Sequence, residues 1–120
     1  MQAKPKEFED LLLFVDGESI FALNKYTGSL VYKTNLGKSV GRRGFTVDHD
    51  REYVAITASS GARVGENAGS TLFLLDVKSG KILKKASINY SVVEPILTSD
   101  CIITSGARHG VVQCHDRDLQ

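Results

Sequence analysis

One long segment of this chain occurs twice, and this repeat restricts the possible folds more than any other feature. SIFALNKYTGSLVYKTNLG at residues 19–37 aligns without a gap with TLFLLDVKSGKILKKASIN at residues 71–89, at an offset of 52 positions (71 − 19). A third, partial copy begins at GVVQCHD, residues 110–116. Repeats of a few tens of residues are typical of solenoids and propellers, in which each unit buries its apolar face against the next.

Each copy has the pattern of a strand, a tight turn and a second strand. In LNKYTGSLV and LDVKSGKIL an apolar run ends at Asn24 or Asp76, and a glycine, Gly28 or Gly80, follows four residues later. Asn and Asp side chains accept hydrogen bonds from backbone amides just ahead of them, and glycine tolerates the positive φ of a tight reversal. The repeat therefore predicts a β-hairpin that is closed by its own side chains.

The remainder of the chain consists of similar short apolar runs between clusters of Gly, Asp, Asn and Ser. This pattern is typical of strands, and no long stretch shows an apolar stripe at helical spacing. We predict an all-β chain of about ten strands, at residues 11–15, 19–24, 30–34, 44–48, 53–58, 71–76, 81–87, 95–99, 101–105 and 111–116.

Composition and charge exclude several classes of protein. A chain of 120 residues is one domain at most, and 42% hydrophobic with 24% charged residues is the balance of an ordinary soluble protein. A net charge of +1 provides no attraction to nucleic acid or to an anionic membrane. The charged start, MQAKPKEFED, lacks the apolar core of an export signal. The longest apolar run, LLLFV, is far shorter than the roughly 20 residues of a membrane helix.

The repeat resembles that of a known superfamily. SIFALNKYTGSLVY and STLFLLDVKSGKILK, and more weakly GVVQCHD, are similar to the repeat of quinoprotein-type β-propellers, the pyrroloquinoline-quinone-like repeat superfamily. The similarity covers about residues 11–116. Repeats of that superfamily often end in a tryptophan, and Tyr32 and Lys84 stand at the corresponding positions here.

The resemblance implies a partial β-propeller with about two and a half to three four-stranded antiparallel blades. Residues 11–34 would supply the last three strands of one blade, 44–87 a full blade, and 95–116 the first three strands of another. A propeller needs at least about four blades to close, so we expect other copies of the chain, or a longer parent chain, to complete the ring. The N-terminal segment, residues 1–10, is a candidate outer strand. Residues 5–10 of a neighbouring chain, or of another part of the ring, could complete the third blade.

Four arginines are predicted to share one face of the propeller. They lie in loops that leave the blades at the same end: Arg42, Arg43, Arg63 and Arg108. Guanidinium groups in glycine-flanked turns suit carboxylate or phosphate ligands, so these residues are candidates for an anion site. The alternative is that they hydrogen-bond to neighbouring carbonyls and hold the blades together.

Two functions remain open. The first is a scaffold or ligand-binding module with an arginine-lined rim. The second, implied by the resemblance, is a quinoprotein-like dehydrogenase that oxidises an alcohol or sugar with pyrroloquinoline quinone and calcium. The superfamily's calcium ligands and catalytic aspartate have no convincing match in this sequence, so we assign neither cofactor. Its members are mostly exported bacterial proteins, which suggests a periplasmic or secreted location. Because the sequence shows no export signal, two alternatives stay open: a signal was removed, or the protein stays inside the cell.

The histidines give no metal site at sequence level. His49 lies between Asp48 and Asp50, but a solvated turn accounts better for this segment. His109 and His115 lie at two strand ends of one hairpin without a third ligand.

Cys101 and Cys114 lie on two neighbouring predicted strands. If Ser105 pairs with Val111, the two sulfurs lie on opposite faces of the sheet, and we then expect two free thiols. A slip of one residue in this register would allow a disulfide.

Overall fold

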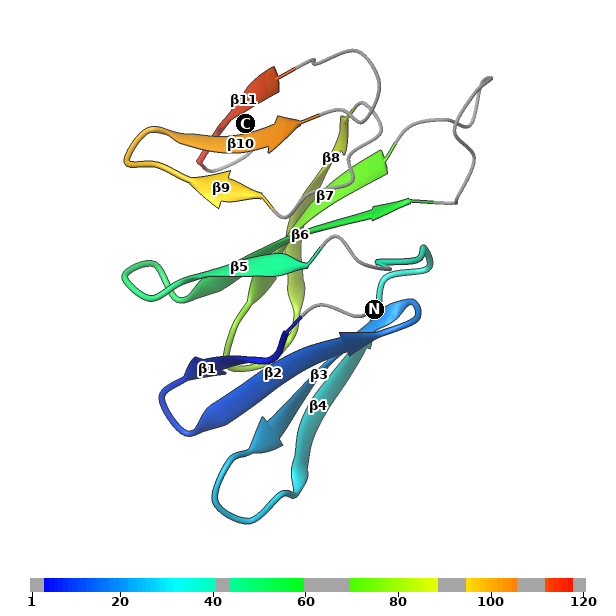
Figure 1. Cartoon of the computed structure of the whole chain (residues 1–120), viewed down its shortest axis with the longest axis vertical. Helices are drawn as coiled ribbons and strands as arrows, with labels where there is room; N and C mark the ends of the chain where they lie inside the picture. Colours follow the sequence, from blue (N-terminus) through cyan, green and yellow to red (C-terminus); the bar gives the residue numbers. More distant parts are fainter. Residues whose placement is uncertain (1–3, 41–43, 60–69, 89–94, 106–111, 118–120) are drawn as a thin grey trace.

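The computed structural model describes residues 4–40, 44–59, 70–88, 95–105 and 112–117. The described residues form three antiparallel sheets of four, four and three strands (Figure 1). This confirms the predicted all-β, partial propeller with two and a half to three blades. The strands are β1 (Lys6–Phe8), β2 (Leu11–Asp16), β3 (Ser19–Asn24), β4 (Leu30–Asn35), β5 (Phe45–Asp48), β6 (Tyr53–Ser59), β7 (Ser70–Asp76), β8 (Ile82–Ile88), β9 (Ile96–Leu97), β10 (Cys101–Ser105) and β11 (Val112–Asp116).

The molecule measures 44 × 29 × 21 Å. The sheets are stacked face to face along its longest axis. Figure 1 shows the first sheet (β1 to β4) at the bottom, the second (β5 to β8) in the middle and the third (β9 to β11) at the top. In each sheet the strands follow one another in chain order, as in an up-and-down blade. The first strands of the second and third sheets are neighbours, and the Thr46 hydroxyl donates to the Pro95 carbonyl.

The N-terminal segment has a different place from the one expected for it. Residues 5–10 are a candidate for the outer strand of the third blade, supplied by a neighbouring chain or by another part of the ring. In the structure Lys6–Phe8 pairs with β2, with Lys6 opposite Leu13 and Phe8 opposite Leu11. Phe8 is 2% exposed, and burial of this aromatic ring accounts for the pairing of so short a strand within its own chain.

The repeated turns have the predicted geometry. The Asn24 side-chain oxygen accepts hydrogen bonds from the amides of Tyr26 and Thr27, at 2.9 and 3.0 Å. Asp76 accepts from the amide and the hydroxyl of Ser79, at 2.9 and 2.7 Å. Gly28 and Gly80 both have φ of 76°, the left-handed conformation that favours glycine.

The two middle strands of the second sheet, β6 and β7, are buried on both faces. Side chains along a strand alternate between the two faces, and all seven residues of β6 are buried. One face contributes Val54, Ile56, Phe73 and Leu75 to a core shared with the first sheet. The other contributes Tyr53, Ala55, Leu72 and Leu74 to a core that contains Leu97 and Ile102 of the third sheet. The second sheet is therefore the central layer of the structure.

A tyrosine connects the first sheet to the second. The Tyr32 hydroxyl donates to the Val77 carbonyl at 2.8 Å, and Thr34 donates to the Gly80 carbonyl at 2.6 Å. A Cβ atom placed on Gly80 would lie 2.3 Å from Cδ1 of Tyr32, so the ring rests on the glycine backbone. Tyr32 stands where the superfamily often has tryptophan, and here it contacts the turn of the next blade.

The expectation of two free thiols is wrong. Ser105 pairs with Val112 rather than Val111, so that Cys101 lies opposite Asp116 and Cys114 opposite Ile103. This register differs by one residue from the one assumed, and it places both cysteines on the same face of the sheet. They form a disulfide with Cα atoms 5.5 Å apart.

Across the ranges that the structure describes, no helix has the length and apolar character needed to cross a membrane.

The contact between Tyr32 and Gly80 predicts different costs for two equivalent substitutions. Alanine at positive φ costs about 1–2 kcal/mol, so Gly28→Ala should lower the free energy of unfolding by that amount. A Cβ atom added at Gly28 would have no other atom within 4 Å, whereas one added at Gly80 would meet the Tyr32 ring and the Thr34 hydroxyl. We expect Gly80→Ala to cost a further 1–3 kcal/mol, roughly the cost of overpacking. Urea unfolding measures both; equal losses, or a difference that persists when Tyr32→Ala and Thr34→Ala are combined, would contradict the contact.

Tyr32 also predicts a loss of stability at high pH. Burial, with a smaller contribution from Asp76, raises the pKa of Tyr32 to about 12. The unfolded chain releases this proton near pH 10, so the stabilisation is complete below pH 10 and is lost as the pH rises toward 12. Because the ring is only half-buried, we expect a loss of about 1 kcal/mol. Tyr32→Phe should reduce the slope of stability between pH 10 and 12, whereas Tyr26→Phe, at a residue 74% exposed, should not.

Candidate functional site

The four predicted arginines lie outside the described residues. Arg42 and Arg43 fall in 41–43, Arg63 in 60–69 and Arg108 in 106–111. The structure describes the ends of the strands that flank these loops.

Two of these loop ends are adjacent. Ser39 and Ser59 form an isolated β-bridge, with N to O distances of 3.0 and 2.9 Å. The Val40 amide donates to the Gly17 carbonyl at 3.0 Å, which brings the β4–β5 connection against the β2–β3 turn. The residues that precede loops 41–43 and 60–69 therefore meet at one end of the first two sheets.

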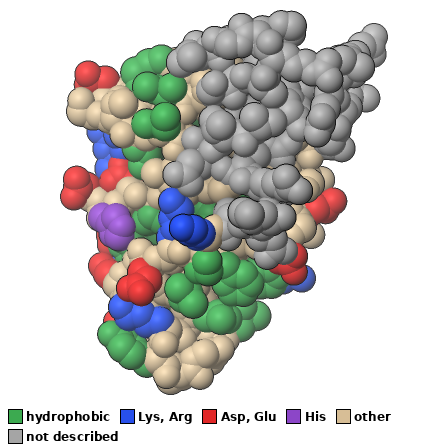
Figure 2. Space-filling view, viewed as in Figure 1, with side chains coloured by type: hydrophobic (Ala, Val, Ile, Leu, Met, Phe, Trp, Pro, Cys, Tyr) green, Lys and Arg blue, Asp and Glu red, His purple; other side chains and the backbone are tan. Residues whose placement is uncertain are grey.

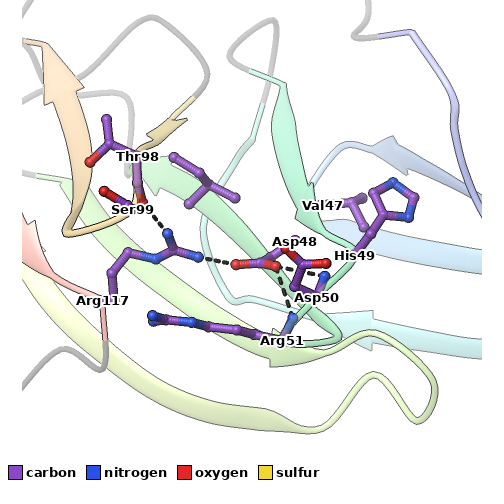
Figure 3. A pocket seen from close by; sticks show the side chains of 9 residues that line it. Val47, Asp48, His49, Asp50, Arg51, Thr98, Ser99 and Arg117 are labelled. Carbon is purple, nitrogen blue, oxygen red and sulfur yellow. Dashed lines mark hydrogen bonds and ion pairs between the residues drawn. The ribbon is translucent and has the colours of Figure 1, made fainter.

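The described residues also form a groove at the opposite end of the sheets. It lies between the β5–β6 turn and the β9–β10 turn and has a volume of about 550 Å³. Its lining residues are Val47, Asp48, His49, Asp50, Arg51, Leu97, Thr98, Ser99 and Arg117 (Figure 3). Four of these side chains are Asp or Arg, so the groove has a strongly charged lining.

Local sequence explains where the charged groups stand. Asp48 ends β5, and its Oδ1 accepts hydrogen bonds from the amides of Asp50 and Arg51, both at 2.9 Å. This is the same type of side-chain-closed turn as in the two repeats. Arg117 directly follows Asp116, which corresponds to Asp76 of the repeat, so Arg117 occupies the position of Val77.

Arg117 is buried and fully engaged, with 8% of its surface exposed. Its Nε donates to the Tyr53 hydroxyl at 2.7 Å, and its two terminal nitrogens contact the Thr98 carbonyl and Oδ2 of Asp48. Figure 3 shows the guanidinium between Thr98 and Asp48. Its carbon also lies 5.6 Å from the centre of the Tyr53 ring. Since Asp48 and Tyr53 belong to the second sheet and Arg117 follows the third, this cluster connects the two sheets.

The same three positions between the first and second sheets are apolar. Phe8 pairs with Leu11 as Asp48 pairs with Tyr53, and Val77 corresponds to Arg117. Phe8 and Val77 are buried in one core, with Leu11 packed against it. One backbone arrangement therefore carries an apolar contact at one interface and a buried ion pair at the next.

The Asp48 carboxylate is not available to a metal. Oδ1 accepts two backbone amides and Oδ2 contacts Arg117, so both oxygens are occupied by the protein. The His49 ring stacks on Phe8 with centroids 5.3 Å apart. Among the described ranges, no group of three or more His, Cys, Asp or Glu side chains could hold a metal ion.

His115 is held within the third sheet. Its Nε2 lies 3.0 Å from the Thr104 hydroxyl, and burial lowers its pKa. His109, the other histidine of this hairpin, lies outside the described residues.

Sequence reasoning did not identify Arg117 or Tyr53. The third repeat was followed only to Asp116, one residue before the arginine. A signal was present, because aligning the repeats one position further places a charged residue where Val77 is buried. The identity of its partner could not be read from the repeat, since Asp48 lies 69 positions away.

Comparison with known proteins places the fold among propellers. No protein-family profile and no curated protein matches the sequence. Solved structures match over 92–96% of this chain at 16–17% identity. They include a quinohemoprotein alcohol dehydrogenase from Pseudomonas putida HK5 (TM-score 0.73), a europium-containing methanol dehydrogenase (0.70) and BamB from Moraxella catarrhalis (0.61).

This likeness confirms the predicted resemblance to quinoprotein-type propellers at the level of fold. The chain covers only 19%, 22% and 30% of the lengths of these three proteins, respectively. It therefore corresponds to an arc of a propeller rather than to a closed ring.

The buried ion pair predicts a strong dependence on both partners. Arg117→Val removes the cation and leaves Asp48 buried, which should lower the free energy of unfolding by about 3–5 kcal/mol. The triple variant Asp48→Phe, Tyr53→Leu and Arg117→Val reproduces the apolar set of the other interface, and we expect it to recover most of this loss. Arg51→Ala, in the same groove, should change stability by less than about 0.5 kcal/mol. A mild effect of Arg117→Val in denaturant unfolding would show that the pair is not formed.

Proposed function

We propose that this chain is part of a β-propeller that serves as a scaffold and binding platform and not as a catalyst. The observation that carries this proposal is the state of the charged groove. Arg117 and Asp48 satisfy each other and neighbouring backbone groups, so they connect two sheets. A catalytic acid, base or metal ligand needs a group that is free to react with a substrate.

The open ends of the arc support a ring completed by further blades. The first sheet has a neighbour on one face and the third sheet likewise, so one face of each terminal sheet faces outward. Ile96, on the third sheet, is 56% exposed. Exposed sheet faces are normally covered, and the covering blades would come from other copies of the chain or from a longer parent chain.

We propose that Arg42, Arg43, Arg63 and Arg108 form an anion-binding rim on the loop-bearing end of this platform. Support comes from the bridge between Ser39 and Ser59, which brings together the residues preceding two of the three loops. Guanidinium groups gathered in this way would suit a carboxylate or phosphate ligand.

The disulfide supports a location in an oxidising compartment. Cross-links such as Cys101–Cys114 persist in the periplasm and outside the cell, and they are rare in the reducing cytosol. This agrees with the periplasmic or secreted location that the resemblance suggests.

A second candidate is a quinoprotein-like dehydrogenase. Two of the similar structures are named as an alcohol and a methanol dehydrogenase, which favours this alternative. The third, BamB, has the same fold without a dehydrogenase name, so the fold does not determine the activity. The donor groups of the described residues do not fit a calcium ion, because no cluster of three carboxylate, thiol or imidazole side chains is present among them. We therefore derive no step through a quinone or a metal.

The two candidates differ in their response to added ligands. We expect phosphate or citrate to raise the melting temperature by several degrees at saturation, since a ligand that binds only the folded state stabilises it. Replacing all four rim arginines by alanine should abolish this shift. Lys84→Ala with Lys85→Ala, which removes exposed charges from β8, should leave it intact.

Pyrroloquinoline quinone with calcium tests the alternative. The scaffold function predicts no alcohol-dependent reduction of an electron-acceptor dye when both are added. Turnover of an alcohol under these conditions would overturn the scaffold function. If phosphate and citrate do not change the melting temperature, the proposed anion-binding rim is wrong but the scaffold function is not affected.

A further inference from the structure

We propose that the outward face of the first sheet is a docking surface for the third sheet of a second copy of this chain. This proposal rests on the proposed propeller scaffold and specifies what completes it. We call this surface the first-sheet outer face. Its members are Leu12, Phe14, Phe21, Leu23 and Lys25.

The repeat itself shows that this face is built to be covered. Leu12 pairs with Leu23 and Phe14 with Phe21 across β2 and β3, and the two phenylalanine rings stack with centroids 5.0 Å apart. The equivalent residues of the second sheet pair in the same way. Those residues are Val54, Ile56, Phe73, Leu75 and Val77, and all are at most 4% exposed because the first sheet covers them.

On the first sheet the corresponding apolar residues are only half-buried. Figure 2 shows hydrophobic side chains gathered over β2 and β3 in the lower half of the view. The positions and the pairing are the same in the two sheets. A partner for the first-sheet outer face should therefore resemble the face of the first sheet that covers the second sheet.

The outward face of the third sheet, at the other end of the stack, is of this type. The third-sheet outer face consists of Ile96, Cys101, Ile103 and Cys114, with the exposed Asp116 at its edge beside Cys101. Ile103 pairs with both Ile96 and Cys114. Ile103 corresponds to Ala55, and Cys114 to Leu74, of the second sheet, and both of these are buried against the third sheet. The two outer faces are therefore the two halves of one type of interface.

Charge at the ends of the two faces is complementary. Lys25 occupies the position of Arg117, which meets an acid at the end of the preceding sheet's first strand. The corresponding turn of the third sheet is Thr98 to Asp100, and Asp100 is exposed. Lys25 now pairs with Glu7 of its own sheet at 3.3 Å, with 28% of its side chain exposed. In a docked copy it would lie beside the turn that contains Asp100.

The contact uses two different faces, so it is head-to-tail and each copy can bind one neighbour on either side. Such heterologous contacts close into rings when the rotation between copies permits. The other face of the third sheet has Gln113 and His115 at the positions of Phe73 and Leu75, and it is already packed on the second sheet of its own chain through Ile102 and Leu97. The apolar face of the first sheet is left for the apolar face of the third.

The molar mass of the full chain, measured by light scattering after size-exclusion chromatography, tests the proposal directly. We expect a mass at a multiple of 13.1 kDa that is constant at micromolar and higher concentrations. Phe14→Glu with Phe21→Glu blocks the first-sheet outer face, and Ile96→Glu with Ile103→Glu blocks the third-sheet outer face. Each double variant alone should be monomeric.

An equimolar mixture of the two double variants provides the decisive result. One variant keeps an open first-sheet face and the other an open third-sheet face, so a single head-to-tail interface can form and a species of two chains should appear. A symmetric dimer, made from one face twice, would not be restored by mixing. Leu83→Glu, at an exposed position of β8 away from both faces, should leave the wild-type mass unchanged.

The disulfide gives a readout that needs no variant. Cys101 and Cys114 lie on the third-sheet outer face, so docking should slow their reduction by a phosphine as the concentration of wild-type chain rises. A monomeric wild type, or a reduction rate independent of concentration, would overturn the docking proposal and leave the scaffold function to a longer parent chain. Alcohol oxidation with added quinone would overturn the scaffold function and leave the docking proposal standing.

Discussion

The structure depends on one constraint, which is that every interior strand has two apolar faces. Side chains alternate along a strand, so a single sheet can be covered on both sides only if another sheet packs on each. In β6 this is complete, since all seven residues are buried and successive side chains enter different cores. A lone four-stranded sheet of this composition would expose both apolar faces, so the repeat commits the chain to a stack.

Stacking alone would not fix the order of the sheets, and the cluster around Arg117 adds the missing selectivity. A buried ion pair adds little net stability relative to apolar residues of similar size, because desolvation offsets much of the attraction. A wrong partner would instead leave a charge buried and unpaired, which is costly. Asp48 and Tyr53 therefore select Arg117 as their packing partner. The apolar Phe8 and Leu11 select Val77. The same backbone geometry thus distinguishes two interfaces by chemistry.

Local pattern was sufficient to predict much of the fold. The turns at Asn24 and Asp76 and the alternation along the strands depend on residues close in sequence, and both appear as predicted. Errors arose where the outcome depends on a register or on a distant partner. The pairing of Ser105 with Val112 shifted by one residue and reversed the expectation for Cys101 and Cys114. The alternation of side chains along each strand does not reveal a one-residue shift in pairing, because each register is locally plausible.

The site was predictable only in part, for a related reason. The contact of Arg117 with Asp48 joins residues 69 positions apart, and nothing in either local sequence indicates the other. The hydrogen bond from Nζ of Lys38, which follows β4, to the Thr71 hydroxyl of β7 at 2.9 Å is a similar long-range contact. The rim arginines fall outside the described residues, so their grouping stays a proposal. Their prediction used only the order of strands and loops, which the sheet topology supports.

The two ends of the sheets differ in what they leave for binding. At the end that carries the repeated turns, the polar side chains of Asn24, Asp48 and Asp76 are used to close the turns themselves. Changing them for a ligand would disturb the hairpins. The opposite end carries the longer connections, including residues 60–69, whose sequence is not needed to close a hairpin of the repeat. Loops of this kind can change in sequence without cost to the stacked sheets.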